Sequence, residues 1–166
     1  MIIGHGDVAG AILDRLDRLY FASGVSNSAE TRESEYGREK RLLQVQDKNA
    51  HLVYFSSLCV YSSVTRYSIH KREMEQLVRA WFPARTLIRI GNITWGNNPH
   101  TLINHLRAQH RRGERVVLRD LYRYPIDLDA FRECLRVEVG GEIDLIARRM
   151  TVSELYQEYV LNAQPA

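Results

Sequence analysis

Residues 55 to 77, FSSLCVYSSVTRYSIHKREMEQL, carry the strongest structural signal in this chain. They begin in an apolar run, LVYFSS (52 to 57), that closes on two serines, and they end in a helical pattern from Tyr67 to Arg79. An apolar strand followed by an amphipathic helix is the repeating unit of a parallel α/β sheet. The helix also places Tyr67 and Lys71 four residues apart, so their side chains share one helix face.

The same alternation extends in both directions along the chain. Strands are predicted at 1–3, 19–23, 52–57, 85–91, 116–118 and 142–146, and helices at 8–19, 30–46, 67–79, 101–113, 128–135 and 152–161. Strands that alternate with helices predict an α/β fold, with a parallel sheet covered by helices on both faces. Because the sequence contains no linker, repeat or low-complexity segment, we expect a single domain over 1–166.

The composition is ordinary for a globular domain, with 45% hydrophobic and 26% charged residues. No run approaches the roughly 18 to 20 apolar residues that a membrane span requires. The start, MIIGHGDVAG, lacks the basic and apolar regions of a secretory signal. Cys59 and Cys134 have no CxxC partner, which argues against zinc and against a disulfide framework. We therefore expect a cytoplasmic protein with reduced thiols, no metal and no membrane contact.

The positive charge is concentrated in HLRAQHRRGERVVLRDLYR, residues 105 to 123, which contains six arginines. Such a surface could attract phosphate groups, including those of nucleic acid, or it could be a solvated helix face. No nucleic-acid motif accompanies it and aromatic residues are not interleaved at a useful period. Nucleic acid is therefore not an expected partner.

The turn at residues 4 to 10, GHGDVAG, matches the pattern GxGxxA through Gly4, Gly6 and Ala9. Glycines allow the backbone to turn tightly and to approach a pyrophosphate, which then lies at the positive end of a helix. Glycines also serve ordinary turns, so the pattern alone leaves both interpretations open. An acidic residue about 20 positions later, which should hold the adenosine ribose, is missing, because the chain there reads FASGVSNS (21 to 28).

Tyr67 and Lys71 could form a proton-transfer site or an incidental surface pair. A phenol has a pKa of about 10, and lowering it to about 7 requires roughly 4 kcal/mol of phenolate stabilisation. A nearby ammonium and a bound cationic nicotinamide ring are plausible sources of that stabilisation in a partly dry site. Ser57, at the end of its strand, could then hydrogen-bond the substrate oxygen while Tyr67 moves the proton.

In combination these motifs resemble the short-chain dehydrogenase/reductase (SDR) superfamily, and specifically its extended, NAD-dependent epimerase/dehydratase branch. The matching segments follow the family's order along the chain: residues 4–10, 21–28, 53–61, 67–71, 89–99, 122–131 and 141–160. The resemblance thus covers nearly the whole sequence and implies a minimal Rossmann-like fold.

The resemblance implies a catalytic trio. Ser57 would orient the substrate hydroxyl or carbonyl, Tyr67 would be the acid/base, and Lys71 would lower the pKa of Tyr67 and bind the nicotinamide ribose. Ser56 is the competing choice for the serine. Ser57 is preferred because it stands four residues before Tyr61, as the family serine stands before its own tyrosine.

The resemblance also implies contacts to a nicotinamide dinucleotide. The implied residues are Gly4, Gly6 and Ala9 at the pyrophosphate, Ala22, Ser23 and Gly24 along the dinucleotide, and Asn92 and Ile93 beside the nicotinamide, together with Tyr67 and Lys71. The cofactor would be NAD or NADP, with a slight preference for NADP because Arg15 or Arg18 could touch a 2′-phosphate. The same two arginines suit a solvated helix face equally well.

The chain departs from the family in three places. Two strand-helix units that relatives carry after the first helix are missing, which truncates one edge of the sheet and leaves the first strand as an exposed edge. The adenosine pocket therefore looks incomplete. The loop between Ser57 and Tyr67 is short, and the substrate-binding C-terminal part, about 114–166, is reduced.

We expect an atypical NAD(P)-dependent oxidoreductase or epimerase/dehydratase-like enzyme that acts on a hydroxyl or carbonyl group, with a nucleotide sugar as one candidate substrate. The alternative is a catalytically inactive Rossmann-like module that binds a nucleotide or a protein. A homo-oligomer, dimer or tetramer, is expected because helices beside the catalytic helix commonly form the subunit interface in this family.

Overall fold

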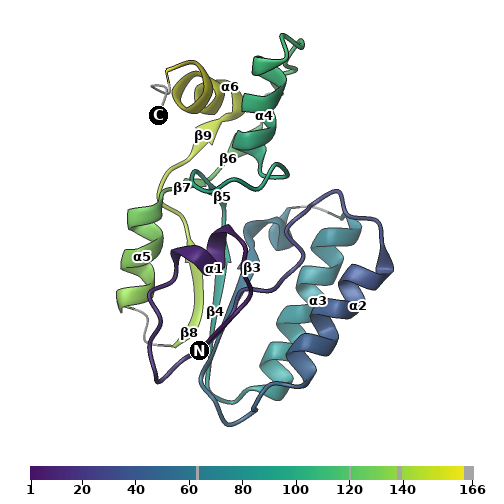
Figure 1. Ribbon diagram of the computed structural model, residues 1–166, viewed down its shortest axis with the longest axis vertical. Helices are drawn as coiled ribbons and strands as arrows, with labels where there is room; N and C mark the ends of the chain where they lie inside the picture. Colours follow the sequence, from purple (N-terminus) through teal and green to yellow (C-terminus); the bar gives the residue numbers. More distant parts are fainter. Residues whose placement is uncertain (63, 120, 138–139, 163–166) are drawn as a thin grey trace.

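The computed structural model describes residues 1–62, 64–119, 121–137 and 140–162, and its main sheet is parallel throughout (Figure 1). The strands are β1 (Ile2–Ile3), β2 (Leu19–Phe21), β3 (Leu52–Ser57), β4 (Arg85–Ile90), β5 (Asn92–Ile93), β6 (Tyr122–Arg123), β7 (Pro125–Ile126), β8 (Gly141–Leu145) and β9 (Met150–Thr151). The helices are α1 (Asp7–Ala11), α2 (Glu33–Gln44), η1 (Leu58–Tyr61), α3 (Arg66–Trp81), α4 (Leu102–Arg111), α5 (Leu128–Val137), α6 (Val152–Tyr156) and η2 (Gln157–Leu161).

The main sheet has the strand order β1-β2-β3-β4-β8, and helices cover both of its faces. Side chains alternate along β3, so Val53 and Phe55 pack in the core that includes Phe131 of α5. Leu52 and Tyr54 point to the other face, into a second core with side chains of α2 and α3. Figure 1 shows the same layers, with α5 and α1 on one side of the sheet and α2 and α3 on the other. The predicted α/β fold is confirmed.

The first strand lies at one edge of the sheet, as the truncation predicts. β1 pairs only with β2 in the main sheet, with Ile2 opposite Tyr20 and Ile3 opposite Phe21. The Met1 ammonium donates hydrogen bonds to the Asp14 carboxylate at 2.8 Å and to a backbone carbonyl at 2.9 Å, which ties the start of the chain to the segment before β2.

The helix predicted at 8–19 is wrong, because α1 ends at Ala11 and Ile12 is already extended, with φ −77° and ψ 131°. Leu13 and Leu16, within the predicted range, are not buried, since their exposed fractions are 71% and 103%. A short helix is marginal in water unless an apolar face packs against a neighbour. Without the two missing strand-helix units, no such neighbour supports a longer helix in the described structure.

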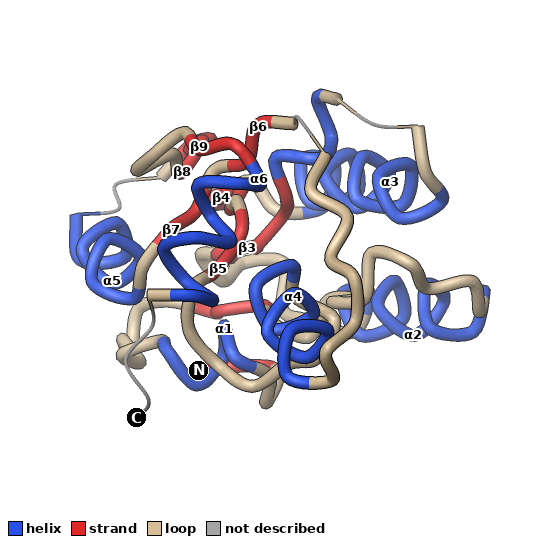
Figure 2. The backbone as a smooth tube through the Cα atoms, turned by 90° about the horizontal axis from the view of Figure 1, so that it is seen from above, coloured by secondary structure: helices blue, strands red, loops and turns tan. Residues whose placement is uncertain are grey.

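The strand predicted at 116–118 is also wrong, since these described residues lie in a loop and Val117 is 72% exposed. Two small two-stranded sheets accompany the main sheet, in which β5 pairs with β7 and β6 pairs with β9. Together α4, β6, β9, α6 and η2 form a small unit, called the cap, which lies above the carboxyl ends of the main strands (Figures 1 and 2). The helix predicted at 152–161 is present as α6 and η2.

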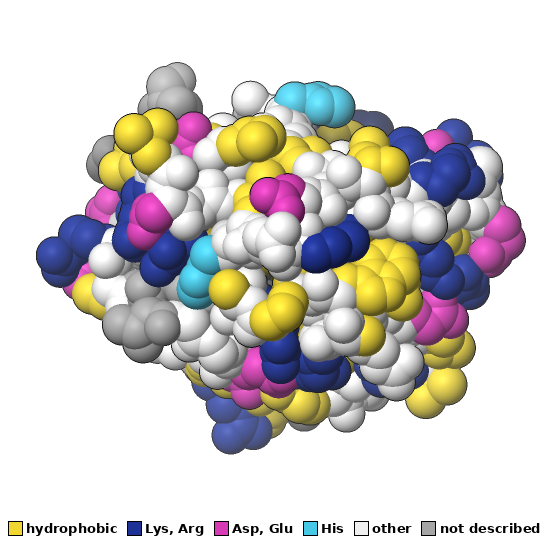
Figure 3. Space-filling model, turned by 90° about the horizontal axis from the view of Figure 1, so that it is seen from below, with side chains coloured by type: hydrophobic (Ala, Val, Ile, Leu, Met, Phe, Trp, Pro, Cys, Tyr) yellow, Lys and Arg dark blue, Asp and Glu magenta, His cyan; other side chains and the backbone are white. Residues whose placement is uncertain are grey.

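The surface shows interspersed charges of both signs when seen from the side opposite the cap (Figure 3). Within the described residues, no helix combines the length and the apolar character that crossing a membrane would demand.

Candidate functional site

The predicted site residues lie at the carboxyl ends of neighbouring parallel strands. Ser57 ends β3, Ala22 to Gly24 follow β2, Asn92 follows β4, and the glycine turn follows β1. In an open α/β sheet this edge is where ligands bind. The structure therefore brings together segments that are up to 90 residues apart in the sequence.

Tyr67 is positioned by the start of α3. Thr65 is the N-cap: its side chain accepts a hydrogen bond from the Ser68 backbone N–H, and the Ser68 hydroxyl accepts one from the Thr65 backbone N–H. This reciprocal capping fixes the first turn of the helix. Arg66 adds a double hydrogen bond to Glu33 of α2, at 2.6 and 2.7 Å. Tyr67 consequently lies on a rigid helical start and not on the preceding loop.

Ser57 and Ser56 have different partners. The Ser57 side chain acts to lower the pKa of Tyr67, and its oxygen accepts a hydrogen bond from the Cys59 backbone N–H at 3.3 Å. The Ser56 side chain is buried and donates to Glu75 at 2.7 Å. Of the two serines, Ser57 is therefore the one that influences Tyr67, and its catalytic role stays a prediction.

Lys71 is buried, with 3% of its surface exposed, and its ammonium already has partners. The Nζ atom donates to Glu39 Oε1 at 3.1 Å and to the Tyr54 hydroxyl at 3.3 Å. It also lies 5.7 Å from the centroid of the Tyr67 ring. The expected proximity of Tyr67 and Lys71 is present, but the ammonium is paired with a carboxylate that belongs to none of the motifs in the sequence.

Glu39 of α2 is fully buried and accepts four hydrogen bonds. Oε1 accepts from Tyr54 at 2.8 Å and from Lys71, while Oε2 accepts from the Val25 backbone N–H at 2.8 Å and pairs with His70 Nε2 at 2.9 Å. Burial acts to raise the pKa of Glu39, but Lys71, His70 and the Val25 N–H together hold that pKa well below its ordinary value. Glu39 is therefore a carboxylate at neutral pH.

The surroundings of Tyr67 raise the pKa of its phenol. Burial is the largest cause, and the charges of Cys59 and Glu39 act in the same direction, whereas the hydrogen bond with Ser57 acts in the opposite one. This direction differs from the lowered pKa that the resemblance implies for Tyr67. In this structure Tyr67 keeps its proton at neutral pH and can donate a hydrogen bond.

The glycine turn contains one position that only glycine can occupy comfortably. Gly4 has φ +128°, and a Cβ atom there would lie 2.4 Å from the Ala22 carbonyl oxygen. Gly6 is exposed at the N-cap of α1, where an added Cβ atom would meet only open space, and Ala9 is buried in the core. The tight turn is thus explained by the approach of β1 to the end of β2.

The start of α1 is covered by the segment that follows β5. The Asp7 carboxylate accepts hydrogen bonds from the backbone N–H groups of Asn97 at 3.1 Å and Asn98 at 2.9 Å. The Trp95 indole donates to the Asp7 carbonyl at 3.2 Å, and a Cβ atom on Gly96 would lie 2.1 Å from Asp7 Cγ. A carboxylate held here opposes the approach of a phosphate.

The segment after β2 lies over the buried ion pair. A Cβ atom on Gly24 would lie 2.7 Å from Lys71 Nζ and 3.0 Å from Glu39 Oε1. Ser23 is held by Arg38, whose guanidinium donates to the Ser23 hydroxyl at 3.1 Å and to its carbonyl at 3.3 Å. The contacts of Ala22, Ser23 and Gly24 with a dinucleotide stay a prediction.

Asn92 and Ile93 form β5, and their backbone is used to pair with β7. The Asn92 N–H donates to the Tyr124 carbonyl at 2.8 Å. Their predicted position beside a nicotinamide stays a prediction. Among the described residues, no three His, Cys, Asp or Glu side chains are grouped in a way that could hold a metal ion.

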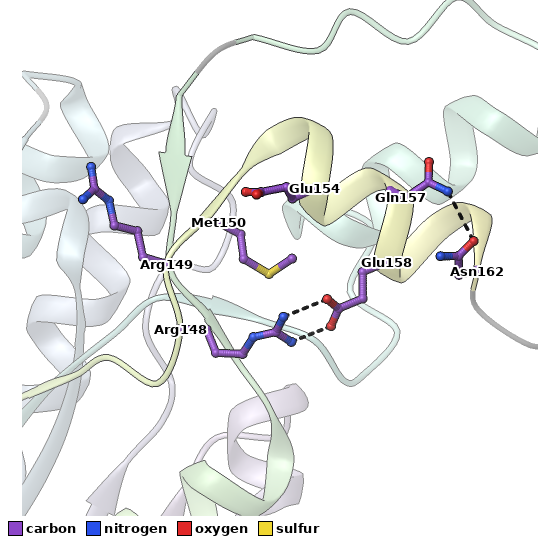
Figure 4. A pocket seen from close by; sticks show the side chains of 7 residues that line it. All are labelled: Arg148, Arg149, Met150, Glu154, Gln157, Glu158 and Asn162. Atoms are coloured by element: carbon purple, nitrogen blue, oxygen red, sulfur yellow. Dashed lines mark hydrogen bonds and ion pairs between the residues drawn. The ribbon is translucent and has the colours of Figure 1, made fainter.

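Two cavities in the described part of the chain have linings that do not include Ser57, Tyr67 or Lys71. One, of about 460 Å³, lies in the cap and is shown in Figure 4, where Arg148 and Glu158 form a double hydrogen bond along its wall. The other, of about 230 Å³, lies between η1, α3 and β4 and is lined by Arg72 and Arg89, among others.

No protein-family profile and no curated protein matches this sequence. Solved structures do match its fold. The Bordetella bronchiseptica enzyme WbmG, in complex with NAD and UDP, has a TM-score of 0.63 at 13% identity, over 90% of this chain and 59% of WbmG. A variant of UDP-glucuronic acid 4-epimerase from Bacillus cereus, in complex with NAD and a fluorinated UDP-glucuronic acid, has a TM-score of 0.67 at 12% identity, over 91% of this chain and 60% of the epimerase.

A UDP-glucose 4-epimerase of Thermus thermophilus, in complex with NAD, has a TM-score of 0.60 at 12% identity, over 90% of this chain and 63% of that enzyme. The chain thus spans about three fifths of the length of the solved structures that it matches. At these identities the comparison concerns the fold, and it confirms the resemblance at that level. The chain has the Rossmann-like α/β fold of these epimerases and of WbmG.

Proposed function

We propose that this chain is a Rossmann-like module that binds an oxygen-rich small molecule, such as a nucleotide sugar, without carrying out tyrosine-based proton transfer. Tyr67 and Ser57 would present their hydroxyl groups to the ligand at the carboxyl edge of the sheet. The observation that carries this proposal is the burial of the Lys71 ammonium against Glu39. Two hydrogen bonds of this ammonium go to Glu39 and Tyr54, and the Glu39 carboxylate balances its charge.

The class of ligand is suggested by the solved structures of the same fold. WbmG was crystallised with NAD and UDP, and the Bacillus cereus epimerase with NAD and a UDP-sugar. A sugar presents hydroxyl and ring oxygens that two neighbouring hydroxyl donors can bind. A dinucleotide is a weaker candidate, because Asp7 and the backbone of 95–98 occupy the start of α1.

The second candidate function is the NAD(P)-dependent oxidoreductase or epimerase. It is favoured by the influence of Ser57, which lowers the pKa of Tyr67, and by the position of Lys71 one helical turn away. In that function NAD or NADP would exchange a hydride with the substrate, and Tyr67 would carry the proton. Arg15 and Arg18 each bind Asp17, so a 2′-phosphate would compete with an existing ion pair.

Titration calorimetry with UDP, a UDP-sugar, NAD and NADPH tests these functions on the wild type. We expect the UDP-sugar to bind and Tyr67→Phe to weaken that binding by about 2- to 10-fold, the size of one hydrogen bond. Tyr61→Phe is the matched control, because its hydroxyl binds Arg89 and Asp144 instead. NADPH absorbance should stay constant in the presence of carbonyl substrates.

The outcomes separate the two candidates. Turnover that Tyr67→Phe abolishes would replace the first proposal with the second. Absence of binding to all four compounds at millimolar concentration would remove both ligand-based functions. Sedimentation of the wild type tests the expected homo-oligomer, which is likewise a proposal.

A further inference from the structure

We infer that Glu39 is a positioning residue that keeps Tyr67 in its protonated, hydrogen-bond-donating state by holding the Lys71 ammonium in a neutral ion pair. The inference rests on the proposed function, because it gives the physical reason why Tyr67 serves as a donor and not as a base. It concerns a residue to which the motifs of the sequence assign no role.

Glu39 is built into the fold so that its carboxylate cannot turn away. Each oxygen accepts two hydrogen bonds, and the donors come from three parts of the chain: Val25 after β2, Tyr54 on β3, and His70 with Lys71 on α3. Glu39 itself lies on α2 with no exposed surface. A buried carboxylate with four donors is fully satisfied, so it remains charged and fixed.

The same contacts determine where the Lys71 charge lies. With Nζ bonded to Glu39 at 3.1 Å and to Tyr54 at 3.3 Å, the ammonium is 5.7 Å from the Tyr67 ring centroid. An ammonium alone at about 4–6 Å lowers the pKa of a neighbouring acid by about 1–3 pH units. The adjacent carboxylate cancels most of that field, because Glu39 Oε1 lies 3.1 Å from Nζ, little more than half of the 5.7 Å from Nζ to the ring centroid.

The remaining groups around Tyr67 do not replace the lost stabilisation. Burial raises the pKa of Tyr67 most, Cys59 of η1 and Glu39 and Tyr36 of α2 raise it further, and Ser57 lowers it. Tyr54 of β3 is buried and itself donates to Glu39. Burial and the groups on α2 and η1 therefore favour the neutral phenol, and Ser57 at the end of β3 opposes them.

The ion pair is also shielded from a ligand. Gly24 passes so close that a Cβ atom would be 2.7 Å from Lys71 Nζ, and only 3% of Lys71 is exposed. A phosphate or ribose cannot reach the ammonium without moving this segment. The neutral pair is consequently part of the folded structure and does not depend on what binds above it.

The test is the titration of Tyr67 in Glu39→Gln, followed by NMR of ring-labelled tyrosine and assigned with Tyr67→Phe. We expect the midpoint to fall by at least about one pH unit relative to wild type, because Lys71 is then unopposed. Glu75→Gln is the matched control. Glu75 is also a buried carboxylate, but it binds Ser56 and Arg89, so its loss should leave the Tyr67 midpoint within about half a pH unit.

A second variant separates charge from structure. In Glu39→Gln/Lys71→Met the ammonium is removed as well, and the Tyr67 midpoint should return toward the wild-type value. A folded Glu39→Gln protein with an unchanged midpoint, or a double variant that keeps the lowered midpoint, would overturn the inference. Should Glu39→Gln not fold, Lys71→Met alone is decisive: its midpoint should rise, and a fall or no change would refute the role of Glu39.

The titration requires no ligand. Its result is therefore independent of the calorimetry that tests the proposed function, and the two can fail separately.

Discussion

Replacing Arg89 with methionine should lower the free energy of unfolding by about 3–5 kcal/mol, the usual effect of removing one partner from a buried ion pair. Arg89 is 6% exposed, and its guanidinium makes a double hydrogen bond to Glu75, at 2.8 and 2.7 Å. It also donates to Glu142 at 2.7 Å, to Asp144 at 3.1 Å and to the Tyr61 hydroxyl at 2.7 Å.

Burial decides which of these partners matters for the magnitude. The Glu75 side chain is 4% exposed, so loss of Arg89 leaves a charge in a dry environment, whereas the side chains of Glu142 and Asp144 are 37% and 39% exposed and can be solvated. Arg79 still contacts Glu75 at 3.0 Å, which favours the lower end of the range, about 3 kcal/mol. For a chain of this length that corresponds to a fall in Tm of roughly 6–12 °C.

Urea denaturation and calorimetry of Arg89→Met measure the loss. Arg89→Met/Glu75→Gln is the informative comparison, because it removes the stranded charge and should recover more than half of the stability. A loss below about 1 kcal/mol in the single variant would refute the reasoning that Glu75 is stranded. A double variant no more stable than the single one would show that packing, and not charge, carries the effect.

Three further predictions concern acid stability, the glycine turn and the start of α3. The pKa of Glu142 is lowered from 4.5 to about 2, mainly by its hydrogen bond to Arg79, so its contribution to stability is present above about pH 4.5 and lost as pH falls toward 2. In chemical denaturation across this range, the free energy of unfolding of Glu142→Gln should decline less steeply than that of the wild type. An equal decline would contradict the assignment. Gly4→Ala should destabilise the protein by about 1–3 kcal/mol, because the position has a positive φ and the new Cβ atom would clash with the Ala22 carbonyl. Gly10→Ala is the control: its Cβ atom, in α1, would meet open space, so the variant should be neutral or stabilising in the same thermal melt. Thr65→Ala should cost about 1 kcal/mol through loss of the cap, and Thr65→Ser should restore most of it; equal stability of all three proteins would argue against the cap.

The sequence was sufficient to predict all five strands of the main sheet and the helices α2, α3 and α5 that cover it. Among them β2, β3 and β4 are apolar and almost wholly buried, and the helices have amphipathic patterns. The two-residue β1 was predicted from the glycine turn that follows it. The helix predicted at residues 8–19 was too long. Hydrophobic periodicity shows which side chains could share a packed face, but it does not show whether another element is there to pack against them. The two-residue strands β5, β7 and β9 have too few residues to carry a recognisable pattern.

The site was predictable to the extent that it is local. The spacing of Tyr67 and Lys71 and the position of Ser57 at a strand end follow from single elements. The pairing of Lys71 with Glu39 depends on how α2 packs against α3, which periodicity does not report. One readable signal existed, since Glu39 lies three residues after Tyr36 and four before Leu43, on the stripe that faces the core. The contact of Asp7 with 97–98 spans about 90 residues and left no comparable sign.

The strand order has a consequence for how the protein is made. The partner of β4 on its outer side is β8, and Arg89 and Asp144, opposite each other in this pairing, are 55 residues apart. At ribosomal speeds of about 5–20 residues per second, β4 waits several seconds for its neighbour while the segment from β5 to α5, including α4 and β6 of the cap, is synthesised. During that interval the outer edge of β4 is unpaired in the nascent chain and is accessible to chaperones. The main sheet is complete only when β8 has been synthesised and has paired with β4.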